Sequence, residues 1–186
     1  MKVKMLMKWF FQKLLKLDMK GKFVIHFLVI AALGFMSYQI QNNFSYNSLK
    51  DLIDILKNAS AMIFTIVGIW IAYIYPNAIT AIVKPDSIDV IAGEQDARRI
   101  EMLVGIIITS AFIIIGIILF FASKSILGGL CWYSENRIWI KPFGITFILF
   151  LSYLQILSIT KVIFSNIMFL NDLHSKLNQK KIEEQL

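Results

Sequence analysis

The most constraining feature of the sequence is an apolar run at residues 102–121, MLVGIIITSAFIIIGIILFF. These 20 residues contain no charge, no proline and no side-chain amide. At about 1.5 Å of rise per residue, a helix of this length spans roughly 30 Å, the thickness of the hydrocarbon core of a bilayer. The run therefore predicts a transmembrane helix, and we interpret the rest of the chain as its neighbouring spans, loops and tails.

The composition indicates a membrane protein throughout, since 58% of the 186 residues are hydrophobic and the charged residues lie between long apolar runs. We predict an all-α membrane protein with four transmembrane helices and an N-terminal basic amphipathic interfacial helix. The expected spans are residues 23–40, 59–83, 102–121 and 142–160. The expected parts are the interfacial helix 1–22, the transmembrane domain 23–169 with a cytoplasmic loop 84–101, and a charged cytoplasmic tail 170–186.

The N-terminal segment places apolar residues on one helical face and basic residues on the other. A helix of this kind lies in the membrane interface with its lysines near anionic lipid head groups. The lysines expected to contact head groups are Lys2, Lys8, Lys13, Lys16 and Lys20. The alternative is a signal peptide cleaved after residues 32–34, although a basic region of about 20 residues is long for a signal peptide.

The basic residues are distributed unequally between the loops. Of 19 Lys and Arg residues, 14 lie before the first span, in the loop 84–101, or from Lys161 onward. The positive-inside rule therefore predicts that both termini are cytoplasmic. Because the net charge of +7 lies beside membrane spans, we expect anionic lipid as its partner and not nucleic acid.

Three further segments carry local predictions. The segment 48–56, SLKDLIDIL, has an apolar face at Leu49, Leu52, Ile53 and Leu56, so we expect it to rest on the membrane surface. Pro76 predicts a kink at the end of the second span, as a gating hinge or a fixed bend. A helix is expected to begin at Glu94 and to continue directly into the third span.

Small residues recur at helical spacing in the second and third spans. Such residues let the backbones of two helices approach closely in lipid. The predicted packing positions are Gly68, Ala72, Gly105, Thr109 and Gly116. Together with the polar residues of the fourth span, these positions form more packing faces than one bundle of four helices needs. We therefore expect a homo-oligomer.

The fourth span contains the most polar stripe of the membrane-embedded sequence. Amides and hydroxyls in lipid need partners, so the stripe is expected to face other helices or water. It consists of Ser152, Gln155, Ser158 and Lys161. Two interpretations stay open, namely hydrogen bonding between helices and the lining of a pore. For His26 in the first span, a proton relay and a structural hydrogen bond are likewise both open.

The chemistry of an enzyme is missing from the sequence. The two histidines lie far apart, and no HExxH, Walker, GxSxG or CxxC motif occurs. We therefore predict no enzyme, no metal and no cofactor. The acidic residues of the loop 84–101 allow a divalent cation or, alternatively, a solvated docking face. Cys131, the single cysteine, excludes an intrachain disulfide and leaves a bridge between subunits or an unpaired thiol.

The four-span layout resembles that of the small membrane subunits of bacterial anti-phage systems, such as the membrane subunit of Kiwa. In addition, the sequence at residues 68–76, GIWIAYIYP, is similar to short sequences in bacterial membrane proteins of this size. The resemblance implies a cytoplasmic protein that docks on the loop 84–101 and the C-terminal tail. The expected docking residues are Asp96, Arg98, Arg99 and Glu101. The first hypothesis is thus a non-enzymatic, oligomeric sensor or scaffold of the bacterial inner membrane. It would recruit a soluble effector through its cytoplasmic face, in anti-phage defence. The alternatives are a channel or depolarising pore, and a small transporter or toxin-immunity protein.

Overall fold

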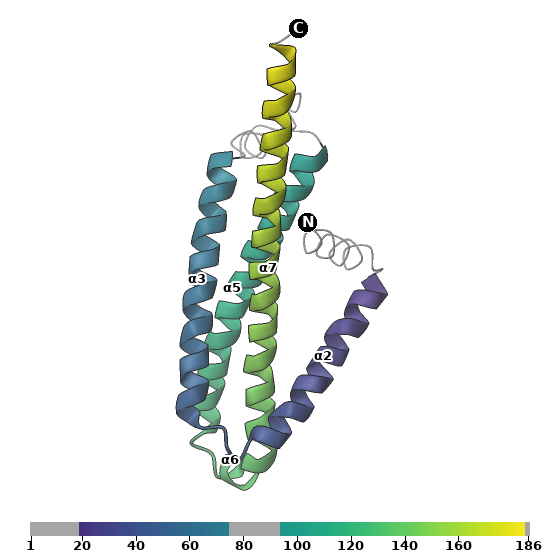
Figure 1. Ribbon diagram of the computed structural model, residues 1–186. Coiled ribbons are helices and arrows are strands. Elements are labelled where there is room, and N and C mark those ends of the chain that lie inside the picture. Colours follow the sequence, from purple (N-terminus) through teal and green to yellow (C-terminus); the bar gives the residue numbers. More distant parts are fainter. Residues whose placement is uncertain (1–18, 75–93, 185–186) are drawn as a thin grey trace.

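The computed structural model describes residues 19–74 and 94–184, and every regular element in these ranges is a helix (Figure 1). The helices are α2 (Met19–Ile40), α3 (Tyr46–Ile74), α5 (Glu94–Leu127), α6 (Cys131–Glu135) and α7 (Arg137–Glu183). Of these helices, α2, α3, α5 and α7 are long and apolar enough to cross a membrane. The predicted all-α fold with four membrane spans is therefore confirmed.

Some predictions fall outside the described residues. They concern the interfacial helix up to residue 18, the Pro76 kink with the end of the second span, and the loop residues 84–93. The predicted helix start at Glu94 is confirmed, because α5 begins there and runs without a break through the third span.

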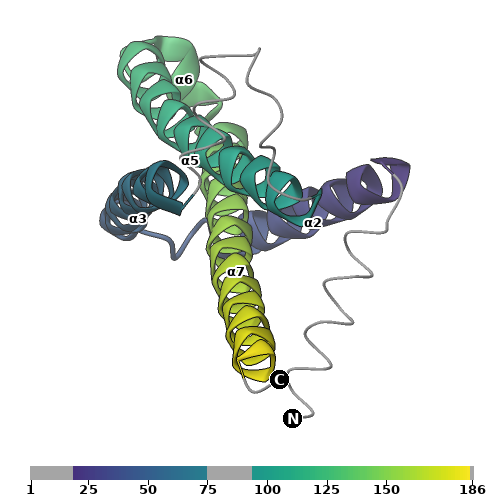
Figure 2. The same cartoon turned by 90° about the horizontal axis from the view of Figure 1, so that it is seen from above.

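Helices α3, α5 and α7 pack against one another along their lengths, whereas α2 packs mainly on α7. Figures 1 and 2 show α2 and α3 on opposite sides of α7. In the most apolar stretch of α2 only 6% of the residues are buried, whereas in the most apolar stretch of α5 33% are buried. Most of α2 therefore faces outward, and the core of the molecule is a three-helix bundle.

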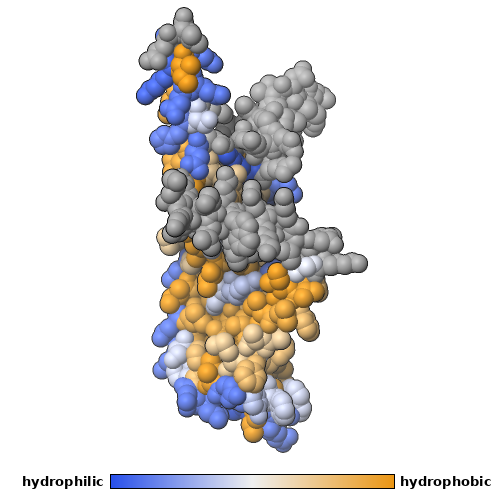
Figure 3. All heavy atoms as spheres, turned by 45° about the vertical axis from the view of Figure 1, so that its right-hand side comes forward, coloured by the Kyte–Doolittle hydropathy of each residue, from blue (hydrophilic) through white to orange (hydrophobic). Residues whose placement is uncertain are grey.

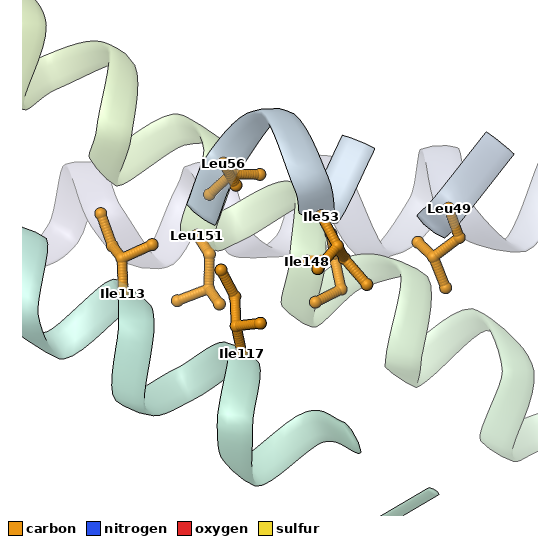
Figure 4. Packing of buried hydrophobic residues seen from close by; sticks show 7 residues of the cluster. All are labelled: Leu49, Ile53, Leu56, Ile113, Ile117, Ile148 and Leu151. Atoms are coloured by element: carbon orange, nitrogen blue, oxygen red, sulfur yellow. The ribbon is translucent and has the colours of Figure 1, made fainter. Parts of the chain in front are cut away.

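Two hydrophobic clusters form the interior of this bundle. The α6-side cluster lies toward α6 and joins all three helices (Figure 4). It contains Leu49, Ile53, Leu56, Ile113, Ile117, Ile148 and Leu151. The second cluster lies toward the end of the bundle from which the carboxyl end of α7 continues, and it contains Val67, Leu103 and Ile106. We call it the arm-side cluster, after the carboxyl-terminal arm of α7 that is described below. Within each cluster, residues that share a helix are spaced by three or four positions, so that they lie on one face of that helix.

The segment 48–56 does not form a separate surface piece, so that prediction is wrong. It is the beginning of α3, whose first turn is capped by Ser45: the backbone N–H of Ser48 donates to Ser45 Oγ at 3.1 Å. Its apolar face enters the α6-side cluster, because Ile113 and Ile148 offer it a protein surface to pack against. Amphipathic spacing identifies an apolar face but not the surface that covers it.

The last span also differs from its predicted limits. We expected Pro142 in the first turn, but α7 begins at Arg137, which places Pro142 in the second turn at the cost of one backbone hydrogen bond. At its other end α7 continues to Glu183 and includes most of the predicted tail. On the face shown in Figure 3, hydrophobic residues gather between a hydrophilic lower end and the hydrophilic end of α7.

Candidate functional site

A layer of buried polar side chains separates the two hydrophobic clusters. Each helix of the bundle contributes to it at the position where its apolar stripe is interrupted. The layer consists of Ser60 of α3, Ser110 of α5, and Gln155 and Ser158 of α7. We call this set the polar layer. In all three helices it falls between residues of the α6-side cluster and residues of the arm-side cluster.

One hydrogen bond crosses the polar layer between helices. The Ser60 hydroxyl donates to Gln155 Oε1 at 3.0 Å, and the Gln155 side chain is only 4% exposed. Among the described residues, Gln155 Nε2 and Ser110 Oγ have no hydrogen-bond partner. An unpaired buried polar group costs about 1–3 kcal/mol, which exceeds the roughly 0.6 kcal/mol of an average hydrogen bond between membrane helices. The layer therefore adds little net stability, and the bond from Ser60 to Gln155 favours one register of α3 against α7.

The predicted polar stripe of α7 is divided between two environments. Gln155 and Ser158 face the bundle interior, whereas Lys161 is exposed. Ser152 donates to the carbonyl of Ile148 at 2.9 Å, so its hydroxyl is satisfied within α7 itself. This geometry favours hydrogen bonding between helices over pore lining for the two residues at the centre of the stripe.

Substitution of Gln155 by leucine tests this interpretation. We expect a stability change within about 1 kcal/mol of zero, because the lost bond to Ser60 is offset by removal of the unpaired amide N–H groups. The double variant Ser60→Ala/Gln155→Leu should be at least as stable as Gln155→Leu alone. Chemical unfolding in detergent measures both. A loss above about 3 kcal/mol for Gln155→Leu would show that the layer is a major source of stability.

The predicted small-residue positions separate into one inner and several outer sites. A Cβ at Gly116 would lie 3.1 Å from Leu151 Cδ1, so this glycine permits the close contact of α5 with α7. A Cβ at Gly68 or Gly105 would meet nothing within 4 Å. Ala72 is exposed, and Thr109 donates to the carbonyl of Gly105 within α5. The outer positions are thus not used for packing in one copy of the chain.

The structure describes the side chains of only two of the residues predicted to contact a partner protein or lipid, namely Arg99 and Glu101. Arg99 is only 5% exposed, whereas Glu101 is exposed. The side chains of Asp96 and Arg98 lie outside the described residues. So do those of the five predicted head-group lysines, namely Lys2, Lys8, Lys13, Lys16 and Lys20.

His26 lies where α2 meets α7. Its ring is half-buried and makes an edge contact with the Tyr153 ring, with centroids 5.8 Å apart. Its Nδ1 has no partner among the described residues. Packing against the Tyr153 ring therefore accounts for the partial burial of His26. Within the described part of the chain, no second titratable group forms a hydrogen bond with its ring.

Two members of the polar layer were not predicted. Ser60 and Ser110 occupy stripe positions that are otherwise apolar, four residues after Leu56 and Ile106 respectively. That spacing is visible in the sequence. It identifies the two serines as interior only once the faces of α3 and α5 that pack inward are known.

In residues 19–74 and 94–184, no group of three His, Cys, Asp or Glu side chains is placed to hold a metal ion. The fold and the polar layer define a multi-pass α-helical membrane protein with a hydrogen-bonded three-helix core. Comparison with family models, curated proteins and solved structures finds no match to this chain.

Proposed function

We propose that the protein is a non-enzymatic, oligomeric scaffold or sensor of the bacterial inner membrane that recruits a cytoplasmic protein. The resemblance in layout to membrane subunits of anti-phage systems suggests defence as its setting. Gly68 and Gly105 support the homo-oligomer, because in the described part of the chain no residue from another helix would lie within 4 Å of a Cβ at either glycine.

The observation that carries the proposal is the length of α7. Its 47 residues correspond to roughly 70 Å of helix, more than twice the thickness of the hydrocarbon core. Contact of α7 with α3 extends as far as Phe169, whose ring centroid lies 6.2 Å from that of Trp70. Residues 170–183 follow this contact as a continuous helix that projects from the bundle (Figure 1). We call this segment the arm.

The arm presents an apolar stripe to its surroundings. Leu170, Leu173 and Leu177 are spaced by three and four residues and are 53%, 44% and 49% exposed. A helix that is polar elsewhere and carries such a stripe outside the membrane has the pattern of one partner in a helix–helix contact. We therefore assign the docking of the soluble partner to the stripe of the arm, with Glu101 beside the start of the third span as a second contact.

A double substitution tests the docking stripe. In Leu173→Glu/Leu177→Glu, two carboxylates replace apolar contacts, so recovery of the cytoplasmic partner from the native host should fall at least tenfold, which corresponds to about 1.4 kcal/mol. Co-purification with quantitative mass spectrometry provides the measurement. The matched control is Ser175→Glu/Gln179→Glu, which adds the same charge at exposed positions off the stripe. Equal losses in both variants, or no loss in the first, would contradict docking on the stripe.

The channel alternative requires the stripe of α7 to face water. In a single copy, Gln155 is buried and accepts a hydrogen bond from Ser60. The geometry therefore supports the scaffold more than the pore. Ion flux through liposomes that responds to Gln155→Leu would favour the pore instead.

A further inference from the structure

A groove opens at the α6 end of the bundle, opposite to the arm. It has a volume of about 970 Å³ and lies between the first turns of α3 and α7 and the last turns of α5. This volume is near the upper end of the roughly 300–1,000 Å³ that small-molecule sites occupy. Its apolar wall is formed largely by Leu119, Phe120, Phe143 and Phe147.

Three cationic side chains also line the groove, namely Lys124, Arg137 and Lys141, and no Asp or Glu is among its described lining residues. The Lys124 ammonium lies 3.0 Å from the centroid of the Tyr46 ring, and Lys141 donates to the carbonyl of Gln41. These contacts fix both side chains in place but supply no negative charge. An ammonium has three N–H donors, so each lysine keeps donors for an anion.

The amino ends of α3 and α7 add to the positive potential of the groove, whereas the carboxyl end of α5 opposes it. Arg137 is the first residue of α7, and the Asn136 side chain before it does not cap that helix. The amino end of a helix dipole favours an anion. A cluster of three cations at this end is thus stabilised when an anionic group lies between them.

We propose that this groove binds one anionic phospholipid, with its phosphate near Lys124, Arg137 and Lys141 and an acyl chain along the phenylalanine wall. The charge of the groove matches a phosphate, and its apolar wall matches a hydrocarbon chain. A free phosphate would leave that wall without an occupant. The groove lies at one end of the spanning helices, where the head groups of a leaflet are found. This site is separate from the predicted lysine face of the N-terminal segment and does not depend on the arm.

Native mass spectrometry of the full chain in an uncharged detergent tests the site. We expect one phosphatidylglycerol bound per chain, with at least tenfold lower occupancy for phosphatidylcholine at the same concentration. Thermal unfolding should shift upward with phosphatidylglycerol and should not shift with inorganic phosphate. Equal occupancy by the two lipids, or an equal shift with inorganic phosphate, would overturn the proposal.

Substitutions of groove residues test whether the lipid binds in the groove. Lys124→Gln/Arg137→Gln should lower phosphatidylglycerol occupancy at least tenfold. The matched control Lys50→Gln/Lys57→Gln removes two exposed charges of α3 that do not line the groove, and should bind as the unmodified chain does. Phe143→Ala, at a side chain that is 78% exposed, provides a second test if the charge variant loses its helical structure. Unchanged binding in Phe143→Ala and in the folded charge variant would place the lipid elsewhere and refute the site.

Discussion

Replacing Ile148 by alanine is expected to destabilise the bundle by about 2–3 kcal/mol, the lower part of the range for large-to-small substitutions in cores. Ile148 is fully buried in the α6-side cluster, where all three helices of the bundle meet. In lipid, removal from water contributes little to helix association, so the loss arises from the dispersion contacts that the missing side-chain atoms made. The midpoint of chemical unfolding in detergent measures this change.

The matched control for this prediction is Ile156→Ala. Ile156 lies on the same helix but is 62% exposed, so its truncation opens no cavity. We expect a change below about 0.5 kcal/mol, as for surface substitutions away from structural features. If both variants unfolded at the same midpoint, the bundle of α3, α5 and α7 would not be the stabilising core.

Gly116→Ile is the second substitution with a large expected effect, about 1–3 kcal/mol from overpacking. An added Cβ would lie 3.1 Å and 3.3 Å from the two methyl carbons of Leu151 and 3.5 Å from Phe147 Cζ. The end of the Leu151 side chain can yield to an alanine, so Gly116→Ala should cost much less than Gly116→Ile. A branched side chain forces α5 away from α7. Unfolding midpoints of the two variants measure the difference.

Gly105→Ile provides the control on the same helix. In the described ranges, no atom of another helix lies within 4 Å of a Cβ at Gly105, so the fold of one copy should be unaffected. If the outer small-residue face joins two copies, as the proposed homo-oligomer requires, the mass of the detergent-solubilised particle should fall while the helical content stays constant. A large loss of stability in Gly105→Ile with no change in mass would contradict the assignment of this face to the outside of the bundle.

The spans could be predicted from sequence because a bilayer imposes length and apolarity on each helix. The same reasoning failed for Leu49, Ile53 and Leu56. Their apolar face fits a membrane surface and a protein interior equally well, and only the contacts with Ile113 and Ile148 decide between them. Similarly, the requirement for apolar residues fixes neither the start of α7 at Arg137 nor its end at Glu183, since a helix of 47 residues is longer than the hydrocarbon core is thick.

The candidate site was predicted in part. Gln155 and Ser158 were singled out by their polarity in an apolar run, and both lie in the polar layer. The hydrogen bond from Ser60 joins residues 95 positions apart, so no local pattern indicates it. The cationic groove depends on the meeting of α3, α5 and α7 at the α6 end, which is a property of packing and not of any single segment.

We propose that the arm of α7 lies in the cytoplasm and that the α6 end of the bundle lies on the opposite side of the membrane. Labelling with a membrane-impermeant maleimide tests it, in chains that carry Cys131→Ser with either Ser175→Cys on the arm or Asn47→Cys in the first turn of α3. Both positions are exposed. We expect Asn47→Cys to be labelled in intact cells and Ser175→Cys only after permeabilisation. Labelling of Ser175→Cys in intact cells would contradict the claim, and with it the recruitment of a cytoplasmic partner by the arm.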